Sequence, residues 1–215
     1  MTGRLCGGRR RARSAADKAE REQQILTAAD ALFRERGLDR LTLAEVAAHT
    51  GLTKAALYRY FRSKEVLFLA VYRRALDRLV AAIEALPAQA FPGGFTDTLL
   101  AHDSYCRLTA ILHVALESGL SEQEAKDFKH HLLHQTRRLQ ARIESISRQP
   151  PEACFRYLMQ CQQALIGCWH LSHPSDTVAR AMAEPPLSAF RLDFADTLRQ
   201  HLALLTDALV NGRNG

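Results

Sequence analysis

The chain has 215 residues, 47% of them apolar and 24% charged, which is enough for one large domain or two small ones with a proper core. No stretch approaches the roughly 18 uninterrupted apolar residues of a membrane helix, and no apolar segment of the kind a secretory signal needs follows the first arginines. These two absences argue against a membrane protein and an exported one, so we expect a cytoplasmic protein. The formal net charge is +6.

The positive charge is concentrated at the front of the chain. Residues 1–64 hold 14 Lys and Arg against 7 Asp and Glu, whereas residues 65–215 hold 15 against 16. This imbalance predicts a polyanionic partner for the front alone, although five of the arginines stand in a Gly-rich leader, where a solvated tail would give the same excess. Five cysteines do not indicate a disulfide framework, so we expect free and mostly buried thiols.

Helical signals begin soon after the start of the chain. Residues 1–14 have the composition of a disordered basic leader. Apolar residues then recur at helical spacing over residues 15–36, and Gly37 stands where a helix C-cap glycine belongs. Thr42 and Glu45 predict a capping box that opens a short second helix.

A third helix follows a tight turn. Gly51 predicts a positive φ in that turn, and Thr53 is a second candidate N-cap for a helix that runs to about Tyr60. Ser63 can cap a fourth helix, which reaches about residue 86.

The remainder of the chain also has helical periodicity. After a linker at 89–94, with a capping box at Ser121 and Glu124, helices are expected over residues 95–118, 121–148, 152–171 and 187–210. No strand candidate longer than a few residues is found, so the sequence predicts an all-α protein of about nine helices.

The third helix has two unlike faces. Leu57 and Phe61 fall on one side, and the opposite side carries Ala55, Tyr58, Arg59 and Arg62, with Lys54 beside them. An α-helix fits the major groove of DNA, where Arg can bind guanine edges, and Lys, Thr and Tyr suit phosphate oxygens. Two helices joined by a glycine turn therefore indicate a helix-turn-helix, and the alternative is an ordinary helical hairpin with a solvated face.

Residues 25–71 carry a long gapless pattern. It consists of A-x-x-L-F at Ala29–Phe33, Gly37, T-x-x-x-[VI]-A at Thr42–Ala47, Gly51–Leu52, and L-Y-x-Y-F-x-x-K-x-x-L at Leu57–Leu67. This pattern resembles the DNA-binding domain of TetR-family regulators. The resemblance covers about a quarter of the chain, and the length of the chain and its late helices also fit that family.

The resemblance implies a homodimeric, ligand-responsive transcription factor, usually a repressor, that binds double-stranded DNA at a palindromic operator. Tyr58, Tyr60 and Lys64 would contact phosphates, while Lys54 and Arg59 would read bases; many relatives carry an aromatic residue at the position of Arg59. The family's DNA contacts carry over onto Thr42, Thr53, Lys54, Ala55, Tyr58, Arg59, Tyr60 and Lys64.

The expected organisation has four parts: the basic leader 1–14, the helix-turn-helix domain 15–62, the connecting fourth helix 63–86, and a dimerisation and effector-binding domain over 95–211. The resemblance places the dimer at the last two long helices, whose apolar stripes could also be monomer core. The residues predicted for the dimer interface are Cys154, Leu158, Cys161, Leu165, Cys168, Phe190, Phe194, Leu198, His201 and Leu205.

Analogy with the family also implies an apolar cavity for an unknown small-molecule effector. The residues predicted to line it are Tyr105, Leu108, Leu112, His113, Phe128, Phe155 and Trp169. The heptad row Cys154, Cys161 and Cys168 is better explained as apolar packing than as a metal site or a disulfide within the helix, because neighbouring sulfurs are about 10 Å apart on one helix. A disulfide between two subunits stays open as an alternative. We expect no metal, including at the histidines near residues 102–113 and 130–134, and no cofactor.

No enzyme signature is present: the sequence has no serine elbow, phosphate-binding loop or HExxH motif. The preferred hypothesis is a DNA-binding repressor that an apolar ligand releases. The alternative is an architectural or partner-binding protein that uses the same DNA-binding domain without an effector, and a fully packed C-terminal body would favour it.

Overall fold

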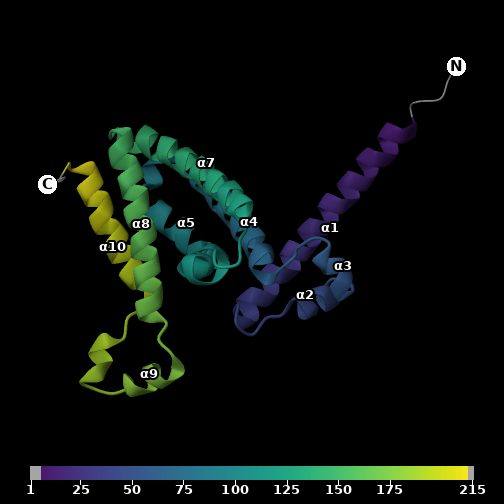
Figure 1. The fold of residues 1–215 in the computed structure, drawn as a ribbon. Coiled ribbons are helices and arrows are strands. Elements are labelled where there is room, and N and C mark those ends of the chain that lie inside the picture. The colour runs from purple at the N-terminus through teal and green to yellow at the C-terminus, as the bar shows by residue number, and fades with distance from the viewer. Residues whose placement is uncertain (1–5, 213–215) are drawn as a thin grey trace. The chain divides into compact units, whose positions relative to one another are not determined.

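The computed structural model describes residues 6–212, with side chains from Ala16 onward, and all regular structure in this range is helical (Figure 1). The all-α fold is confirmed, with ten α-helices in the described part of the chain rather than about nine. The chain forms two compact units that divide after Val71, inside the helix α4 (Lys64–Ala85).

The first unit contains α1 (Cys6–Arg36), α2 (Leu43–His49), α3 (Lys54–Tyr58) and the first turns of α4. The rings of Phe33 on α1 and Phe68 on α4 lie 5.6 Å apart, centroid to centroid, and join these two helices in one core. In this unit α2 packs against both α1 and α3.

The core of this unit explains why such a short α3 keeps its position. Ile25, Val46 and Leu57 are fully buried, and Phe61 just after α3 is nearly so. Burying an aliphatic or aromatic side chain of this size contributes about 1.5–3 kcal/mol. Leu57 and Phe61 therefore anchor one side of α3 and leave its other side at the surface.

The predicted leader, residues 1–14, is only partly within the described chain. Residues 1–5 lie outside it, as do the leader's arginine side chains. The helix α1 begins at Cys6 rather than near Ala15. Arginine and alanine are strong helix formers, so the helix extends further toward the N-terminus than its apolar periodicity indicates.

The second unit continues from the rest of α4, and in it α8 packs against α6, α7 and α10. Its helices are α5 (Gly93–Ala101), α6 (Asp103–Ile111), α7 (Glu122–Ser147), α8 (Pro151–Ser172), α9 (Asp176–Ala181) and α10 (Phe194–Val210). Short helical turns cover Ala88–Ala90, Leu112–Leu116 and Leu187–Phe190, the second of them a π-helix. The capping box predicted at Ser121 opens α7.

The single helix expected over residues 95–118 is wrong, because the chain breaks at His102. The imidazole Nδ1 of His102 donates to the carbonyl of Thr98 (2.7 Å), and the His102 amide donates to Leu99 O instead (3.1 Å). A side chain has thus taken the acceptor that the helical backbone would use, and the backbone leaves the helical region at this residue.

The last helix begins at Phe194 and not at 187, because the Asp193 carboxylate accepts from the Asp196 amide and caps it there (2.9 Å). The segment between α8 and α10 holds a helix that the periodicity did not reveal. Ser175 caps α9, which is too short for an apolar stripe. None of the residues from 173 to 193 is buried.

Candidate nucleic-acid interface and internal cavity

The start of α2 is fixed by a reciprocal cap, as predicted. The Glu45 amide donates to Thr42 Oγ1 (3.3 Å), and the Thr42 amide donates to Glu45 Oε2 (2.8 Å). The Thr42 hydroxyl also donates to that carboxylate (2.8 Å), and Arg36 pairs with its other oxygen (3.1 Å). The hydroxyl proton of Thr42 is engaged by Glu45. An anion at this helix end would therefore accept from the amides of Leu43 and Ala44 more readily than from the Thr42 hydroxyl.

The start of α3 is capped differently. Gly51 has a φ of +66° in the preceding turn, as predicted. Thr53 Oγ1 accepts from the Ala56 amide (3.1 Å), which leaves the hydroxyl proton of Thr53 available to an external acceptor. Of the two capping threonines, Thr53 is therefore the one suited to donate to a phosphate oxygen.

The outward face of α3 carries the predicted readers. Lys54, Ala55 and Arg59 are exposed, and Tyr58 is 44% exposed. The Lys54 ammonium lies 5.8 Å from the centre of the Tyr58 ring, close enough for a cation–π contact. Residues 53–64 contain four Lys or Arg and no Asp or Glu, so this surface is uniformly cationic.

Two further predicted contacts lie at the edge of this surface, and both are half-buried. Tyr60 follows α3 directly, and its amide donates to Leu57 O (2.9 Å). The Lys64 ammonium donates to the carbonyls of Leu38 (2.7 Å) and Leu41 (3.0 Å), which belong to the loop between α1 and α2. Lys64 thus holds that loop with two of its three N–H donors, which leaves the third for another acceptor.

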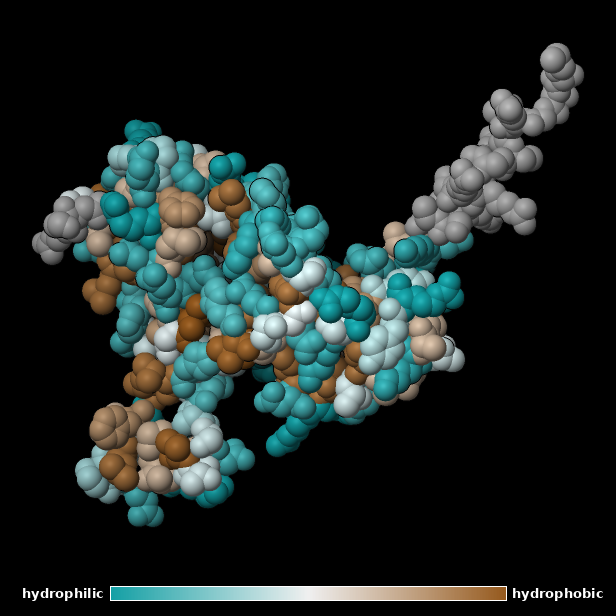
Figure 2. Space-filling view, viewed as in Figure 1, coloured by the Kyte–Doolittle hydropathy of each residue, from teal (hydrophilic) through white to brown (hydrophobic). Residues whose placement is uncertain are grey.

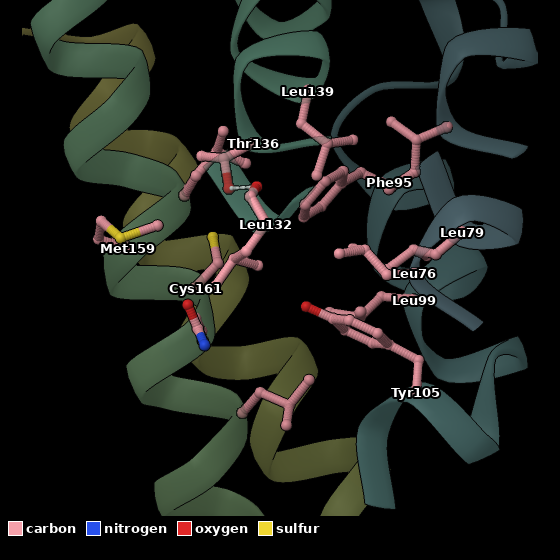
Figure 3. A pocket seen from close by; sticks show the side chains of 14 residues that line it. Leu76, Leu79, Phe95, Leu99, Tyr105, Leu132, Thr136, Leu139, Met159 and Cys161 are labelled. Carbon is pink, nitrogen blue, oxygen red and sulfur yellow. Dashed lines mark hydrogen bonds between the residues drawn. The ribbon is translucent and has the colours of Figure 1, made fainter. Parts of the chain in front are cut away.

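The second unit contains a small cavity of about 50 Å³ between α4, α5, α6, α7 and α8 (Figure 3). Most of its lining is aliphatic or aromatic, and polar atoms come from Tyr105, Thr136, Cys161 and Gln162. The Tyr105 hydroxyl is directed into the cavity. Burial raises the pKa of Tyr105 above its ordinary value, so the phenol stays neutral.

The cavity is not where the sequence placed it, since only Tyr105 of the seven predicted lining residues lines it. Leu108, Leu112 and Phe128 are buried in packed core, and Phe128 meets the ring of Tyr72 (5.7 Å). The others lie elsewhere: His113 and Phe155 are exposed, and Trp169 stacks on His173 (3.8 Å).

The predicted dimer stripe on α8 is also placed differently. Its five members are already buried within a single chain: Cys154, Leu158, Cys161, Leu165 and Cys168. Leu198 of α10 is buried in the same way. Among the other predicted residues, Phe190 and His201 are exposed, and Phe194 and Leu205 are half-buried. A monomer core and a dimer seam have the same heptad pattern, and α8 uses that pattern for its core.

The thiols and histidines whose side chains the structure describes form no ligand cluster. Among the described residues no group of three or more His, Cys, Asp or Glu side chains is arranged to hold a metal ion. His113 pairs with Glu117 (3.0 Å), and His131 lies against Asp77 (2.8 Å). None of the helices between residues 6 and 212 combines the length and hydropathy of a bilayer-spanning segment.

Sequence reasoning missed most of the cavity lining. Leu76, Leu79 and Ile83 of α4 recur at three- and four-residue steps, which marks an inward face but does not separate a cavity wall from solid core. The polar lining residues Thr136 and Gln162 had no local signal, because their position depends on how α7 and α8 pack.

Two family models match the chain. Residues 25–71 match the one described as bacterial regulatory proteins, tetR family, and residues 69–209 match the one described as tetracyclin repressor-like, C-terminal domain. Together they cover both units.

Three curated relatives each match about a third of this chain. The transcriptional activator FasR of Mycolicibacterium smegmatis is 39% identical over 80 residues, 37% of this chain and 36% of its own length. The nucleoid occlusion factor SlmA of Haemophilus influenzae is 43% identical over 67 residues, 31% of each chain. The transcriptional repressor BepR of Brucella suis is 40% identical over 63 residues, 29% of this chain and 30% of its own. Each match spans about a third of the relative's length.

A solved structure shares the fold over most of the chain. The crystal structure of a tetR-family transcriptional regulator from Streptomyces coelicolor superposes with a TM-score of 0.58 at 19% identity, over 90% of this chain and 83% of the other.

Proposed function

This chain belongs to the TetR family of bacterial regulatory proteins, which bind DNA, dimerise and are not enzymes, and from that premise we propose that it is a homodimeric, ligand-gated repressor of a palindromic operator. The observation that carries the proposal is the outward face of α3. Its lysine, arginine and tyrosine side chains are exposed together, while Leu57 and Phe61 hold the helix from behind. A rigid cationic helix face of this kind suits the major groove.

The roles of the eight proposed contact residues follow from their donors. Lys54 and Arg59 carry the free cationic ends that can reach base edges, and Ala55 between them allows close approach. Thr53, Tyr58 and Tyr60 offer hydroxyl donors to phosphates. Lys64 offers its third N–H to a phosphate. Thr42 marks the start of α2, whose first amides would face the sugar–phosphate backbone of DNA.

The dimer needs a surface other than the buried stripe of α8. Exposed apolar side chains occur on α8, on α10 and on the segment joining them, including Phe155, Leu204 and Phe190, the last two 71% and 67% exposed. Figure 2 shows hydrophobic surface over α10 and over the α9 segment. We place the partner against this surface, together with the predicted residues Phe194, His201 and Leu205, because a partner would remove it from water.

The effector site that we propose is the cavity behind α4. Three α4 residues line it, and the same helix begins at Lys64, beside the α3 surface. A ligand that displaces α4 would therefore alter how α3 is presented. Such a ligand releases DNA only if it binds the off-DNA state more tightly than the other state.

The direct test is selection of bound duplexes from a random pool, followed by band shifts on the selected site and its variants. We expect a palindrome with half-sites about one helical turn apart. The Arg59→Ala change should cost about 1–3 kcal/mol and relax specificity at one base position per half-site. Equal losses on every operator variant would make Arg59 a phosphate contact, and no enrichment of any duplex would remove the proposal.

A second candidate function is a DNA-binding architectural protein without an effector. Two observations favour it: the similarity to the nucleoid occlusion factor SlmA, and a cavity of only about 50 Å³, far below the roughly 300–1,000 Å³ of drug-sized pockets. A protein whose operator affinity no small molecule changes, and which binds many chromosomal sites, would support this candidate over the repressor.

A further inference from the structure

The pair of helices α4 and α7 shows two adjacent faces with different chemistry. Toward the cavity, the pair presents residues such as Leu76 and Ile83 of α4 and Leu132 and Leu139 of α7. Each of these has a polar neighbour one position away in the sequence, turned by about 100° around its helix. The cavity wall and a row of polar side chains therefore run side by side along the same helix pair.

The polar row is continuous, and we call it the α4–α7 ladder: Asp77, Glu84, His131, Gln135 and Arg138. Gln135 Nε2 donates to Asp77 Oδ1 (2.8 Å), and His131 Nε2 lies 2.8 Å from the same oxygen. Arg138 donates through Nη1 to Gln135 Oε1 (2.9 Å) and through Nε to Glu84 Oε1 (2.9 Å). A second contact, from Arg138 Nη2 to Glu84 Oε2, makes this pair bidentate.

The ladder joins α4 to α7, two of the helices that line the cavity, alongside the residues with which they line it. Its pairs are made at hydrogen-bond distances, so a separation of the two helices beyond the reach of these side chains breaks several contacts together. Gln135 is buried, and the side chains of Arg138 and Glu84 are each about one-third exposed. Water can replace the outer contacts, which makes opening costly but reversible.

The cavity excludes charge and, in the closed form, excludes large molecules. None of its lining residues is Asp, Glu, Lys, Arg or His. A volume of about 50 Å³ holds a water or two but no organic ligand of ordinary size. A charged group there would lose its hydration with no counter-charge to replace it, whereas a neutral hydroxyl would meet Tyr105, Thr136 or Gln162.

We propose that the effector is an uncharged, mainly aliphatic molecule with one hydrogen-bonding end, and that the α4–α7 ladder is the latch it must open. The link from this latch to DNA release rests on the function proposed above. The ligand binds the open form, in which α4 and α7 have moved apart. The strength of the ladder sets the fraction of molecules in this open form when no ligand is bound. Each weakening of the ladder raises the open population, so the apparent Kd of the ligand falls by the same factor.

The test uses 1-octanol as the uncharged probe and octanoate and octylammonium as probes of equal chain length but opposite charge. Binding is measured by titration calorimetry on the full-length protein. The main variant is Glu84→Gln, which keeps the shape of the side chain and removes its charge from the Arg138 pair. Arg138→Gln breaks the same pair from α7. The matched control is Glu122→Gln, which removes an exposed ion pair with Lys126 from α7, away from the ladder.

We expect octanol to bind the wild type at least about tenfold more tightly than either charged probe. Glu84→Gln and Arg138→Gln should each lower the octanol Kd by about fivefold, the scale of one partly exposed bidentate pair, while the melting temperature without ligand falls. Glu122→Gln should leave the Kd unchanged. A merely structural role for the pair would lower the melting temperature without tightening the binding of octanol.

Three results would overturn the inference. Octanoate or octylammonium binding as tightly as octanol would refute the ligand class. An unchanged or raised octanol Kd in both ladder variants would refute the latch. No octanol binding to the wild type or to either variant, up to its solubility limit, would refute both. None of these titrations uses DNA, so a failed operator selection with tightened octanol binding would refute the proposed function alone.

Discussion

Replacing Lys64 by Met should affect both the stability of the protein and its electrostatic contact with DNA. Methionine keeps the length of the stem but removes the ammonium that donates to Leu38 O (2.7 Å) and Leu41 O (3.0 Å). A hydrogen bond from a charged group contributes about 1.5–3 kcal/mol. Because Lys64 is partly exposed, we take about 2 kcal/mol as the total for its two hydrogen bonds. For a chain of this size that is about 4–8 °C in Tm.

The DNA contribution is separable because it depends on salt. If the third N–H of Lys64 meets a phosphate, its loss should reduce the slope of log K against log salt concentration by about 0.9 per subunit. The assay is fluorescence anisotropy with the selected operator at several salt concentrations, well below the Tm of the variant. Lys126→Met, which removes an exposed lysine from α7, is the control and should change neither quantity.

Each outcome assigns a role to Lys64. A lower Tm with a shallower slope supports both roles, and a lower Tm with an unchanged slope would leave Lys64 as a brace for the loop between α1 and α2. An unchanged Tm would refute the reasoning from the two carbonyl contacts, because those contacts would then contribute nothing measurable.

Three further predictions concern the cap, the thiols and the dimer. Hydrogen bonds from the Thr42 hydroxyl and amide hold the pKa of Glu45 below its ordinary value, so the stabilisation is present above the unfolded pKa of about 4.3 and is lost as pH falls through the lower folded value. Melting curves should therefore show a larger loss between about pH 5 and about pH 3 in the wild type than in Glu45→Gln, and parallel curves would contradict this. Burial raises the pKa of Cys106 and of Cys161 to about 12, so both should resist a disulfide reagent until the protein unfolds; rapid labelling of either thiol in the native protein, mapped by mass spectrometry, would contradict that assignment. Leu204→Asp should raise the dimer Kd by about 30-fold or more in sedimentation experiments, whereas Val114→Asp, an equally exposed apolar site outside the proposed interface, should not; equal effects would move the interface.

Features set by neighbouring residues could be predicted from the sequence. The cap at Thr42 needs only Glu45 three positions on, and the turn at Gly51 needs only a residue that tolerates positive φ. The two-faced α3 follows from the period of a helix. These local rules specify the first unit almost completely, which is why the exposed residues of α3 were those expected.

Features that depend on packing could not be predicted in the same way. The row from Cys154 to Cys168 shows that one face of α8 is buried but does not show against what, and the structure packs it inside its own chain. Similarly, the periodicity over residues 95–118 contained no sign that the His102 side chain would take the Thr98 carbonyl. Predicting the cavity required knowing both the register of α8 and the break between α5 and α6.

In the function that we propose, the helix α4 links the effector site to the DNA-binding surface, because it contributes residues to both units. Its first residue, Lys64, holds the loop ahead of α2, and three turns later Leu76 lines the cavity while Asp77 joins the ladder. A ladder too strong would bar every ligand, and one too weak would leave α4 displaced without any. We infer that a partly exposed polar row beside an uncharged cavity lies between these limits, where the binding of a small aliphatic molecule can change the balance.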